Sequence, residues 1–195
     1  MKPVDVRVEV SDLVYPPSED TFLLADALEV EENDEVLEVG CGSGYVSICA
    51  ATVAKRVVAS DISFEAVRDT VRNARANGVE DHLTVLQSDL LTSLHPSARF
   101  DIIAFNPPYL PADQTQTTLD QALIGGEYGV EIAEKFIHQA VGHLRQSGRI
   151  YIVMSTRCDC ARLERLMVAQ GLDVDKVISR KFFYEELYVL CGTQD

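Results

Sequence analysis

The sequence predicts an α/β protein whose sheet has seven strands, mostly parallel, with an antiparallel last strand. Apolar runs rich in Val and Ile alternate with helical patterns, which is typical of a parallel sheet with helices on both faces. A glycine-rich turn follows the first apolar run and opens a helix. The last two runs are joined only by residues 180–184, which is short enough for an antiparallel hairpin.

Each expected strand is a short apolar run, as is typical where both faces of a sheet are covered. In chain order, the strands are predicted over residues 35–39, 56–60, 83–87, 100–105, 148–154, 172–179 and 186–191. Helical patterns predict helices near residues 18–28, 44–54, 63–77, 129–145 and 158–170. The 195 residues are expected to form a single domain, 1–195, with an N-terminal lid and helix segment (1–30) and a core (35–195).

Composition narrows the class of protein. Hydrophobic residues make up 47% of the chain, which argues against disorder. No apolar run approaches the roughly 20 residues that span a bilayer, and the N-terminus lacks the apolar core of a signal peptide. We therefore expect a soluble cytoplasmic protein with no membrane partner. The five cysteines are expected to be reduced thiols, and no metal site is expected at Cys158 and Cys160, because two further zinc ligands are not apparent nearby.

The net charge of -14, from 31 acidic and 17 basic residues, disfavours tight binding to a phosphate backbone. A solvated acidic surface is the simplest interpretation. Most of the basic residues are arginine, and acidic surfaces poor in lysine suit a cytoplasm rich in salt, where screening weakens self-repulsion. A salt-loving, archaeal source is therefore a hypothesis.

The turn after the first strand carries a ligand-binding pattern, Glu38-Val39-Gly40-Cys41-Gly42-Ser43-Gly44. Glycines allow positive φ angles and a close approach of backbone to ligand. The spacing differs from the G-x-G-x-x-G pattern that seats a pyrophosphate, and the carboxylate of Glu38 would repel a pyrophosphate. It suits a cation instead. S-adenosylmethionine is a nucleoside with an ammonium and a sulfonium and no phosphate, so it is the expected cofactor, bound near Gly40 and Gly42.

Two further strands end in acidic residues. Asp61 follows Gly40 by 21 residues, about the interval at which a carboxylate binds ribose hydroxyls. Asp89 can accept from the adenine amino group, and Leu90 can pack on the ring. In the alternative interpretation, Asp61 caps the helix that starts near Ser63.

The fourth strand ends in Asn106-Pro107-Pro108-Tyr109. The nitrogen of an amide or a base amine is a poor nucleophile because its lone pair is delocalised. The Asn106 side-chain oxygen and the Pro107 carbonyl, with directions fixed by the prolines, can accept both N–H groups and turn the lone pair toward a methyl donor. Tyr109 can stack on the planar group. A proline-rich turn that simply ends a strand is the structural alternative.

At these residues the chain resembles the class I, Rossmann-like methyltransferases of planar amides and amines. Asn-Pro-Pro-Tyr is shared by DNA adenine methyltransferases and by the HemK-type glutamine methyltransferases of release factors. Three segments resemble the eukaryotic and archaeal HemK-like branch: VYPPSEDTFLL (14–24), IGGEYGVEIAEKF (124–136) and SRKFFYEELYVL (179–190). The resemblance implies methylation of the glutamine in the Gly-Gly-Gln motif of a class I release factor, with S-adenosylhomocysteine as product. It also implies that Thr21 touches the cofactor, although Ser18 to Thr21 also read as a helix cap.

The third strand of this fold lies at the sheet edge, and Leu83-Thr84-Val85-Leu86-Gln87 carries no Pro or Lys to protect it. The HemK-like branch works with a small zinc-binding activator protein that adds a strand to its partner, so we expect this activator at residues 83–87. The alternative is an edge covered by loops of the same chain.

Three other functions stay open. DNA adenine methylation uses the same chemistry, but base flipping needs phosphate contacts that this acidic chain lacks. A binding module that keeps a cofactor pocket without catalysis is disfavoured by the intact Asn106-Pro107-Pro108-Tyr109. Methylation of lysine in other proteins is possible as a side activity.

Overall fold

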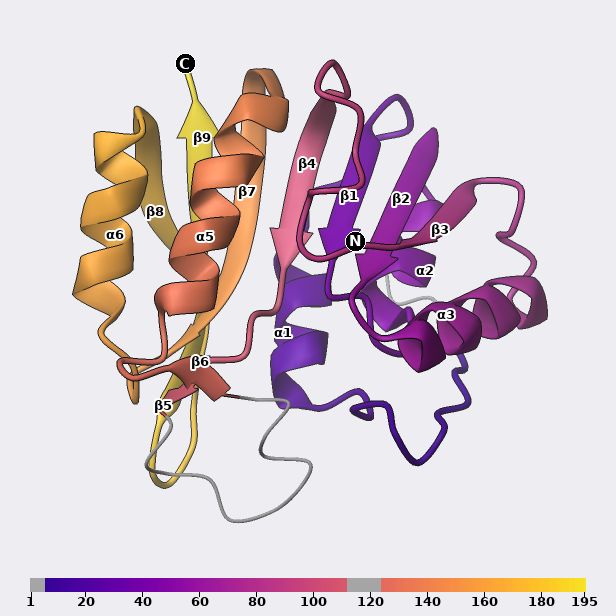
Figure 1. Cartoon of the computed structure of the whole chain (residues 1–195), viewed down its shortest axis with the longest axis horizontal. Helices are drawn as coiled ribbons and strands as arrows, with labels where there is room; N and C mark the ends of the chain where they lie inside the picture. The colour runs from indigo at the N-terminus through magenta and orange to yellow at the C-terminus, as the bar shows by residue number, and fades with distance from the viewer. Residues whose placement is uncertain (1–5, 112–123) are drawn as a thin grey trace.

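The computed structural model describes residues 6–111 and 124–195. Its main feature is a seven-stranded sheet with the order β3-β2-β1-β4-β7-β9-β8 (Figure 1). These strands are β1 (Glu35–Val39), β2 (Arg56–Asp61), β3 (Leu83–Gln87), β4 (Phe100–Phe105), β7 (Leu144–Ser155), β8 (Leu172–Lys181) and β9 (Glu186–Gln194). Strands β3, β2, β1, β4 and β7 pair in parallel, and β9 runs antiparallel to both of its neighbours, β7 and β8. The predicted sheet, including its antiparallel last strand, is confirmed.

Helices cover both faces of this sheet. They are α1 (Glu19–Ala27), α2 (Tyr45–Ala51), α3 (Phe64–Ala76), α5 (Glu131–Ala140) and α6 (Cys160–Ala169). Residues of α1, α2 and α3 belong to one apolar core, and residues of α5 and α6 belong to another. Neighbouring side chains of a strand enter opposite cores: Ile102 lies in the first and Ile103 in the second. The five predicted helices are therefore present, four of them within three residues of their expected bounds.

The region between α5 and β7 differs from the prediction. The expected helix over 129–145 ends at Ala140, and a 3-10 turn, η2 (Val141–His143), follows it. Strand β7 then begins at Leu144, four residues before the predicted start at 148. Pairing with β4 is irregular here, since Leu144 lies opposite Phe100 and Arg149 opposite Ile102. Leu144 is buried in the core beside α5, so tertiary packing rather than local periodicity decides its conformation.

A second, two-stranded sheet was not predicted. It pairs β5 (Leu110–Pro111) with β6 (Ile124–Gly126) in parallel. Strand β5 begins directly after Tyr109, so this small sheet continues the chain away from the Asn106-Pro107-Pro108-Tyr109 turn.

The N-terminal segment is held against α3 by buried polar side chains of that helix. The Glu9 amide donates to Asn73 Oδ1 at 3.0 Å, and the Ser11 amide donates to Asp69 Oδ2 at 2.7 Å. Both acceptors are buried, so these bonds are shielded from water. They fix the path of the chain that leads to Tyr15 and α1.

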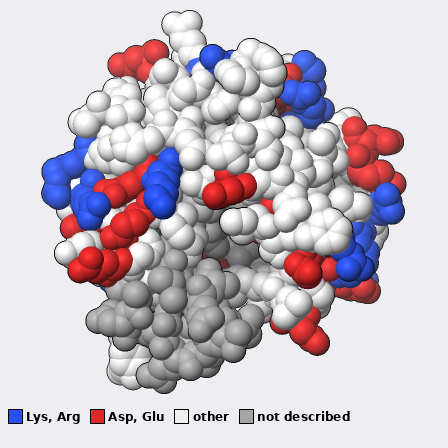
Figure 2. Space-filling view, in the orientation of Figure 1, with Lys and Arg blue, Asp and Glu red and all other residues white. Residues whose placement is uncertain are grey.

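The surface carries mixed charge. On the face in Figure 2, lysines and arginines stand in small groups beside acidic residues, and a hollow opens near the middle of that face. Among the described residues, no helix is long and apolar enough to cross a bilayer.

Candidate functional site

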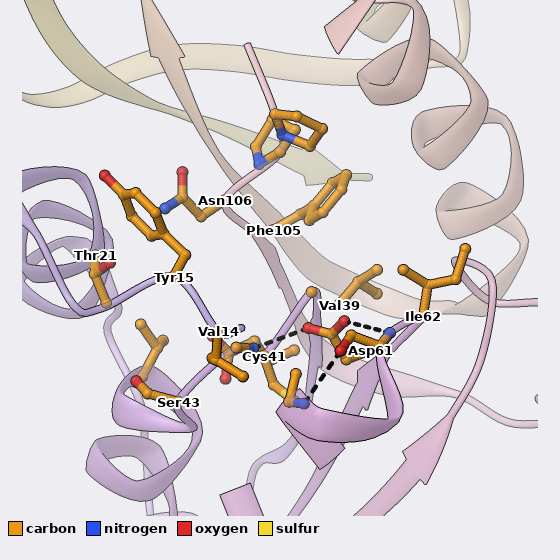
Figure 3. Close-up of a pocket in the computed structure, with 18 of the residues that line it drawn as sticks. Val14, Tyr15, Thr21, Val39, Cys41, Ser43, Asp61, Ile62, Phe105 and Asn106 are labelled. Carbon is orange, nitrogen blue, oxygen red and sulfur yellow. Dashed lines mark hydrogen bonds between the residues drawn. The ribbon is translucent and has the colours of Figure 1, made fainter. Parts of the chain in front are cut away.

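A cavity of about 360 Å³ lies where β1, β2 and β4 end, between the glycine-rich turn and the N-terminal segment (Figure 3). This is the edge at which open α/β sheets bind ligands. Every residue predicted for the site lines it except Tyr109: Thr21, Glu38, Gly40, Gly42, Asp61, Asp89, Leu90, Asn106, Pro107 and Pro108. Residues more than 80 positions apart in the sequence are thus brought together, as the strand order requires.

The glycine-rich turn brings backbone close to the ring that ends β4. Gly40 has φ +67°, and a Cβ placed there would lie 3.0 Å from the Phe105 ring. The turn is tied to β2 by the Cys41 amide, which donates to the Ser60 carbonyl at 3.0 Å. Only glycine satisfies both the positive φ angle and the contact without strain. The turn is therefore a fixed backbone surface facing the cavity.

Asp61 joins two loops at the end of β2. Its Oδ2 accepts from the Gly42 amide at 2.9 Å, and its Oδ1 accepts from the Ser63 amide at 2.9 Å. The N-cap of α3 is Ser63, whose side chain accepts from the Ala66 amide. Asp61 is therefore not the cap of that helix, and each of its oxygens keeps capacity to accept from a ligand. Burial raises the pKa of this carboxyl, although three backbone N–H groups oppose the shift.

Glu38 is an acid removed from water. Its side chain is buried on β1, and Ser47 Oγ donates to its Oε2. Burial raises the pKa of Glu38 to about 8, and the nearby charge of Asp61 adds to the shift. A positive charge in the cavity would favour the ionised form of this group.

The charge of the cavity wall selects a class of ligand. Among the described lining residues, four carry a carboxyl group and none carries a positive charge. The four are Asp20, Glu38, Asp61 and Asp89. Such a wall repels phosphates and attracts cations. It fits a nucleoside with positive charge, which is the chemistry expected from the sequence.

The side-chain oxygen of Asn106 is a hydrogen-bond acceptor without a donor among the described residues. This Oδ1 atom is buried, and it accepts no hydrogen bond from the residues that the structure describes. Such an atom is rare, because an unpaired buried polar group costs about 1–3 kcal/mol. In Figure 3 the Asn106 amide lies beside the Tyr15 ring at one end of the cavity. The arrangement suits a ligand that donates an N–H group.

Tyr109 does not line this cavity. Its ring is buried, its hydroxyl donates to Asp20 Oδ2 at 3.2 Å, and burial raises its pKa. It lines a neighbouring cavity of about 260 Å³, and Tyr15 and Asp20 line both cavities. The structure therefore does not place Tyr109 beside Asn106 in one cavity, and its stacking role stays a prediction.

Several residues that line the cavity were not predicted. Six of them come from the N-terminal segment and from the ends of β2 and β4: Leu13, Val14, Tyr15, Pro17, Ile62 and Phe105. Burial raises the pKa of Tyr15, so its hydroxyl stays protonated at neutral pH. The run Val14-Tyr15-Pro16-Pro17 could have indicated this wall, since two prolines fix the backbone just ahead of α1. Thr21 and Ser18 form a capping box at the start of α1, so the helix-cap interpretation is confirmed. Thr21 also lines the cavity, and its contact with the cofactor stays a prediction.

The strand order and the acidic cavity fit a class I, Rossmann-like methyltransferase that uses S-adenosylmethionine. Residues 18–181 match the methyltransferase small domain family, and the chain belongs to this family.

The similarity to known proteins covers nearly the whole chain. A putative protein N5-glutamine methyltransferase of Methanocaldococcus jannaschii, MJ0928, is 33% identical over 189 residues, which cover 95% of this chain and 94% of the relative. The human methyltransferase HEMK2 is 34% identical over 194 residues, covering 93% and 90%. Among solved structures, the chain resembles one from the E. cuniculi Mtq2–Trm112 complex, which is described as responsible for methylating the eRF1 termination factor. The TM-score is 0.70 at 25% identity, and the match covers 93% of this chain and 99% of that chain.

Proposed function

We propose that this protein methylates the side-chain amide nitrogen of the glutamine in the Gly-Gly-Gln motif of a class I translation release factor, using S-adenosylmethionine and releasing S-adenosylhomocysteine. The observation that carries the proposal is the unpaired, buried Asn106 Oδ1 at the end of an acidic cavity. The names of the relatives, a putative protein N5-glutamine methyltransferase among them, support the same substrate.

The cofactor would be held by residues of the first three strand ends. Asp61 would accept from the ribose hydroxyls, and Asp89 and Leu90 would contact the adenine. Glu38, Thr21 and the backbone of Gly40 and Gly42 would hold the amino-acid end. All of them line the one cavity, and its carboxyl groups match the ammonium and sulfonium charges.

The bound cofactor supplies an electrophilic methyl group on a sulfonium. The chain's own residues prepare the amide that receives it. Asn106 Oδ1 and the Pro107 carbonyl would each accept one N–H of the glutamine, which draws the nitrogen out of conjugation. Pro107 restricts the backbone of Asn106 to extended geometry, and Pro108 does the same for Pro107, so both acceptors project from a fixed backbone. After the new bond has formed, the nitrogen would release one of these protons to water.

The second cavity provides a place for the polypeptide on either side of the glutamine. It meets the first cavity at Tyr15 and Asp20, and Tyr109 forms part of its wall. We assign Tyr109 to holding the planar amide where the two cavities meet. The hydrogen bond from its hydroxyl to Asp20 fixes the ring for that role.

A partner would dock on β3. This strand is at one end of the sheet order, and its Thr84 and Gln87 side chains are exposed. Its free edge suits an added strand from a small zinc-binding activator, and the similar Mtq2 was solved with Trm112. Introducing charge at the edge should weaken such pairing. We expect Thr84→Lys to reduce co-purification with the activator, whereas Val177→Lys on β8, the other sheet edge, leaves it unchanged; equal retention in both variants would exclude β3.

Labelled S-adenosylmethionine tests the whole proposal. The chain and its activator are incubated with release factor, with release factor whose Gly-Gly-Gln carries Asn for Gln, and with duplex DNA. We expect label only in the intact Gly-Gly-Gln peptide. Label in DNA alone would favour the adenine methyltransferase, label on lysine would favour the other protein substrate, and cofactor binding without transfer would favour a binding module. We also propose that the chain acts in the cytoplasm as one domain.

A further inference from the structure

Two thiols form a close pair where β7 leads into α6. The Sγ atoms of Cys158 and Cys160 are 3.0 Å apart, and each lies 2.9 Å from the Ser155 carbonyl oxygen. Both side chains are partly exposed, whereas Cys41, Cys49 and Cys191 are buried. The pair therefore combines access from solvent with a sulfur–sulfur approach that no buried thiol shares among the described residues.

One thiol of the pair is prepared to react. Cys160 is the first residue of α6, where the helix dipole favours negative charge. Hydrogen bonds from the Cys158 thiol and from the Tyr188 hydroxyl lower its pKa. Burial has the opposite effect on Cys49, whose pKa it raises to about 11. A thiolate is the reactive form of cysteine, so oxidation should begin at Cys160.

We propose that Cys158 and Cys160 are an oxidation site, at which a peroxide converts the two thiols into a reversible disulfide that lowers methyl transfer. The Cys160 sulfur takes one oxygen from the peroxide and becomes a sulfenic acid, and one water leaves. The Cys158 sulfur then attacks it, the S–S bond forms, and the hydroxyl leaves with the Cys158 proton as a second water. A dithiol supplies the two electrons and two protons that restore both thiols.

The short distance makes this disulfide accessible, and the short loop makes it easy to reduce. The sulfurs must approach by about 1 Å more to reach the S–S bond length near 2.05 Å. Only Asp159 separates the two cysteines, so the ring that they close is small and strained. Strained disulfides have the more oxidising potentials, which is the property of regulatory rather than structural bonds.

Contacts connect the pair to the proposed catalytic turn. The Asp159 amide donates to the Tyr128 carbonyl at 3.2 Å. Next to Tyr128, the Cβ position of Gly129 would lie 3.0 Å from Cys158 Cβ and 2.4 Å from the Tyr109 carbonyl oxygen. This glycine is thus packed directly between the thiol loop and the backbone of Tyr109. A shift of Cys158 would therefore displace Gly129 and, through it, the backbone of the turn that carries Asn106.

Ser155 gives a second connection. Both sulfurs lie 2.9 Å from its carbonyl oxygen, and the disulfide has no S–H group left to donate to that oxygen. Its hydroxyl donates to Glu185 Oε2 at 2.5 Å, and Glu185 lines the second cavity. Oxidation thus changes the hydrogen bonding of a residue that supports the wall beside Tyr109.

Peptide mass spectrometry after peroxide treatment tests the site itself. The full chain with its activator is treated with hydrogen peroxide, free thiols are blocked, and the digest is analysed without reductant. We expect a Cys158–Cys160 peptide that has lost two hydrogens and regains them with dithiothreitol. A thiol pair that stays reduced while Cys41, Cys49 or Cys191 reacts would overturn the proposal.

The effect on activity rests on the proposed function, so it is read separately on the same samples. We expect the rate of methyl transfer to fall by up to about 10²-fold on oxidation, the loss that a misplacement of about 1 Å can cause, and to recover with dithiothreitol. Cys158→Ser and Cys160→Ala should keep their full rate after peroxide, and Cys49→Ser should respond like wild type. A disulfide that leaves the rate unchanged, or an equal loss in Cys160→Ala, would refute the coupling. If the reduced protein transfers no methyl group, the proposed function fails, and the peptide masses still decide the oxidation site.

Discussion

Replacing Asn106 with alanine should separate activity from stability. The buried Oδ1 has no hydrogen-bond partner in residues 6–111 and 124–195, and such an atom costs about 1–3 kcal/mol in the folded state. Alanine removes that cost and leaves a small void that costs about 1 kcal/mol. The net change in the free energy of unfolding is therefore between zero and about +2 kcal/mol. For a chain of this length, the melting temperature should stay constant or rise by up to about 8 °C. Loss of one positioned acceptor should lower kcat by about 10²–10³-fold.

Scanning calorimetry and single-turnover methyl transfer measure the two effects on one preparation. Gln194→Ala is the matched control, because Gln194 Oε1 is the other buried side-chain oxygen without a partner in the described part of the chain, and it lies at the end of β9. It should match Asn106→Ala in stability and match wild type in activity. If Asn106→Ala melts more than about 4 °C lower, or keeps more than about a tenth of the wild-type rate, the reasoning fails.

Because burial raises the pKa of Glu38 from 4.5 to about 8, the unfolded chain ionises this group first, and stability should fall as pH rises through that interval by up to about 1.4 kcal/mol per pH unit. Melting curves of Glu38→Gln should lack this slope; an unchanged slope would assign it to other groups. Gly40→Ala places a side chain at a φ of +67° and in contact with Phe105, so its free energy of unfolding in urea should fall by about 1–2 kcal/mol. Its affinity for the cofactor, measured by equilibrium dialysis, should also fall. Gly142→Ala, whose Cβ meets nothing within 4 Å, should stay close to wild type in both measurements. Since acidic residues outnumber basic ones by 31 to 17, we expect the unfolding midpoint to rise from dilute to molar KCl; a midpoint that falls would contradict the salt-loving source.

The sheet could be predicted because its strands have simple local signals. The runs at 35–39, 83–87 and 100–105 have the same bounds in the structure, since each is an apolar run that ends at a turn residue or an acid. Leu144 lacked such a signal. It continues a helical pattern in the sequence, yet its side chain is buried only if the chain has already turned into β7. A local sequence pattern does not show that Leu144 would be left unburied if the helix continued.

The site was predictable where backbone positions decide it, and less so where side-chain directions do. Strand ends placed Asp61, Asp89 and Asn106 on one cavity, because parallel strands end at one edge. Tyr109 follows Asn106 by three residues, yet its side chain enters the neighbouring cavity to meet Asp20. Tyr15 reaches the first cavity only because buried side chains of α3 hold the N-terminal segment. Contacts of that kind depend on the whole fold.

The position of β9 bears on how the protein is made. This strand lies between β7 and β8, although it is the last of the three to leave the ribosome. Until residues 186–194 emerge, β8 has no neighbour to pair with and one edge of β7 stays open. A nascent chain therefore carries two unpaired strand edges late in synthesis, a condition in which chaperones protect a chain. Any truncation before Glu186 would make that transient condition permanent.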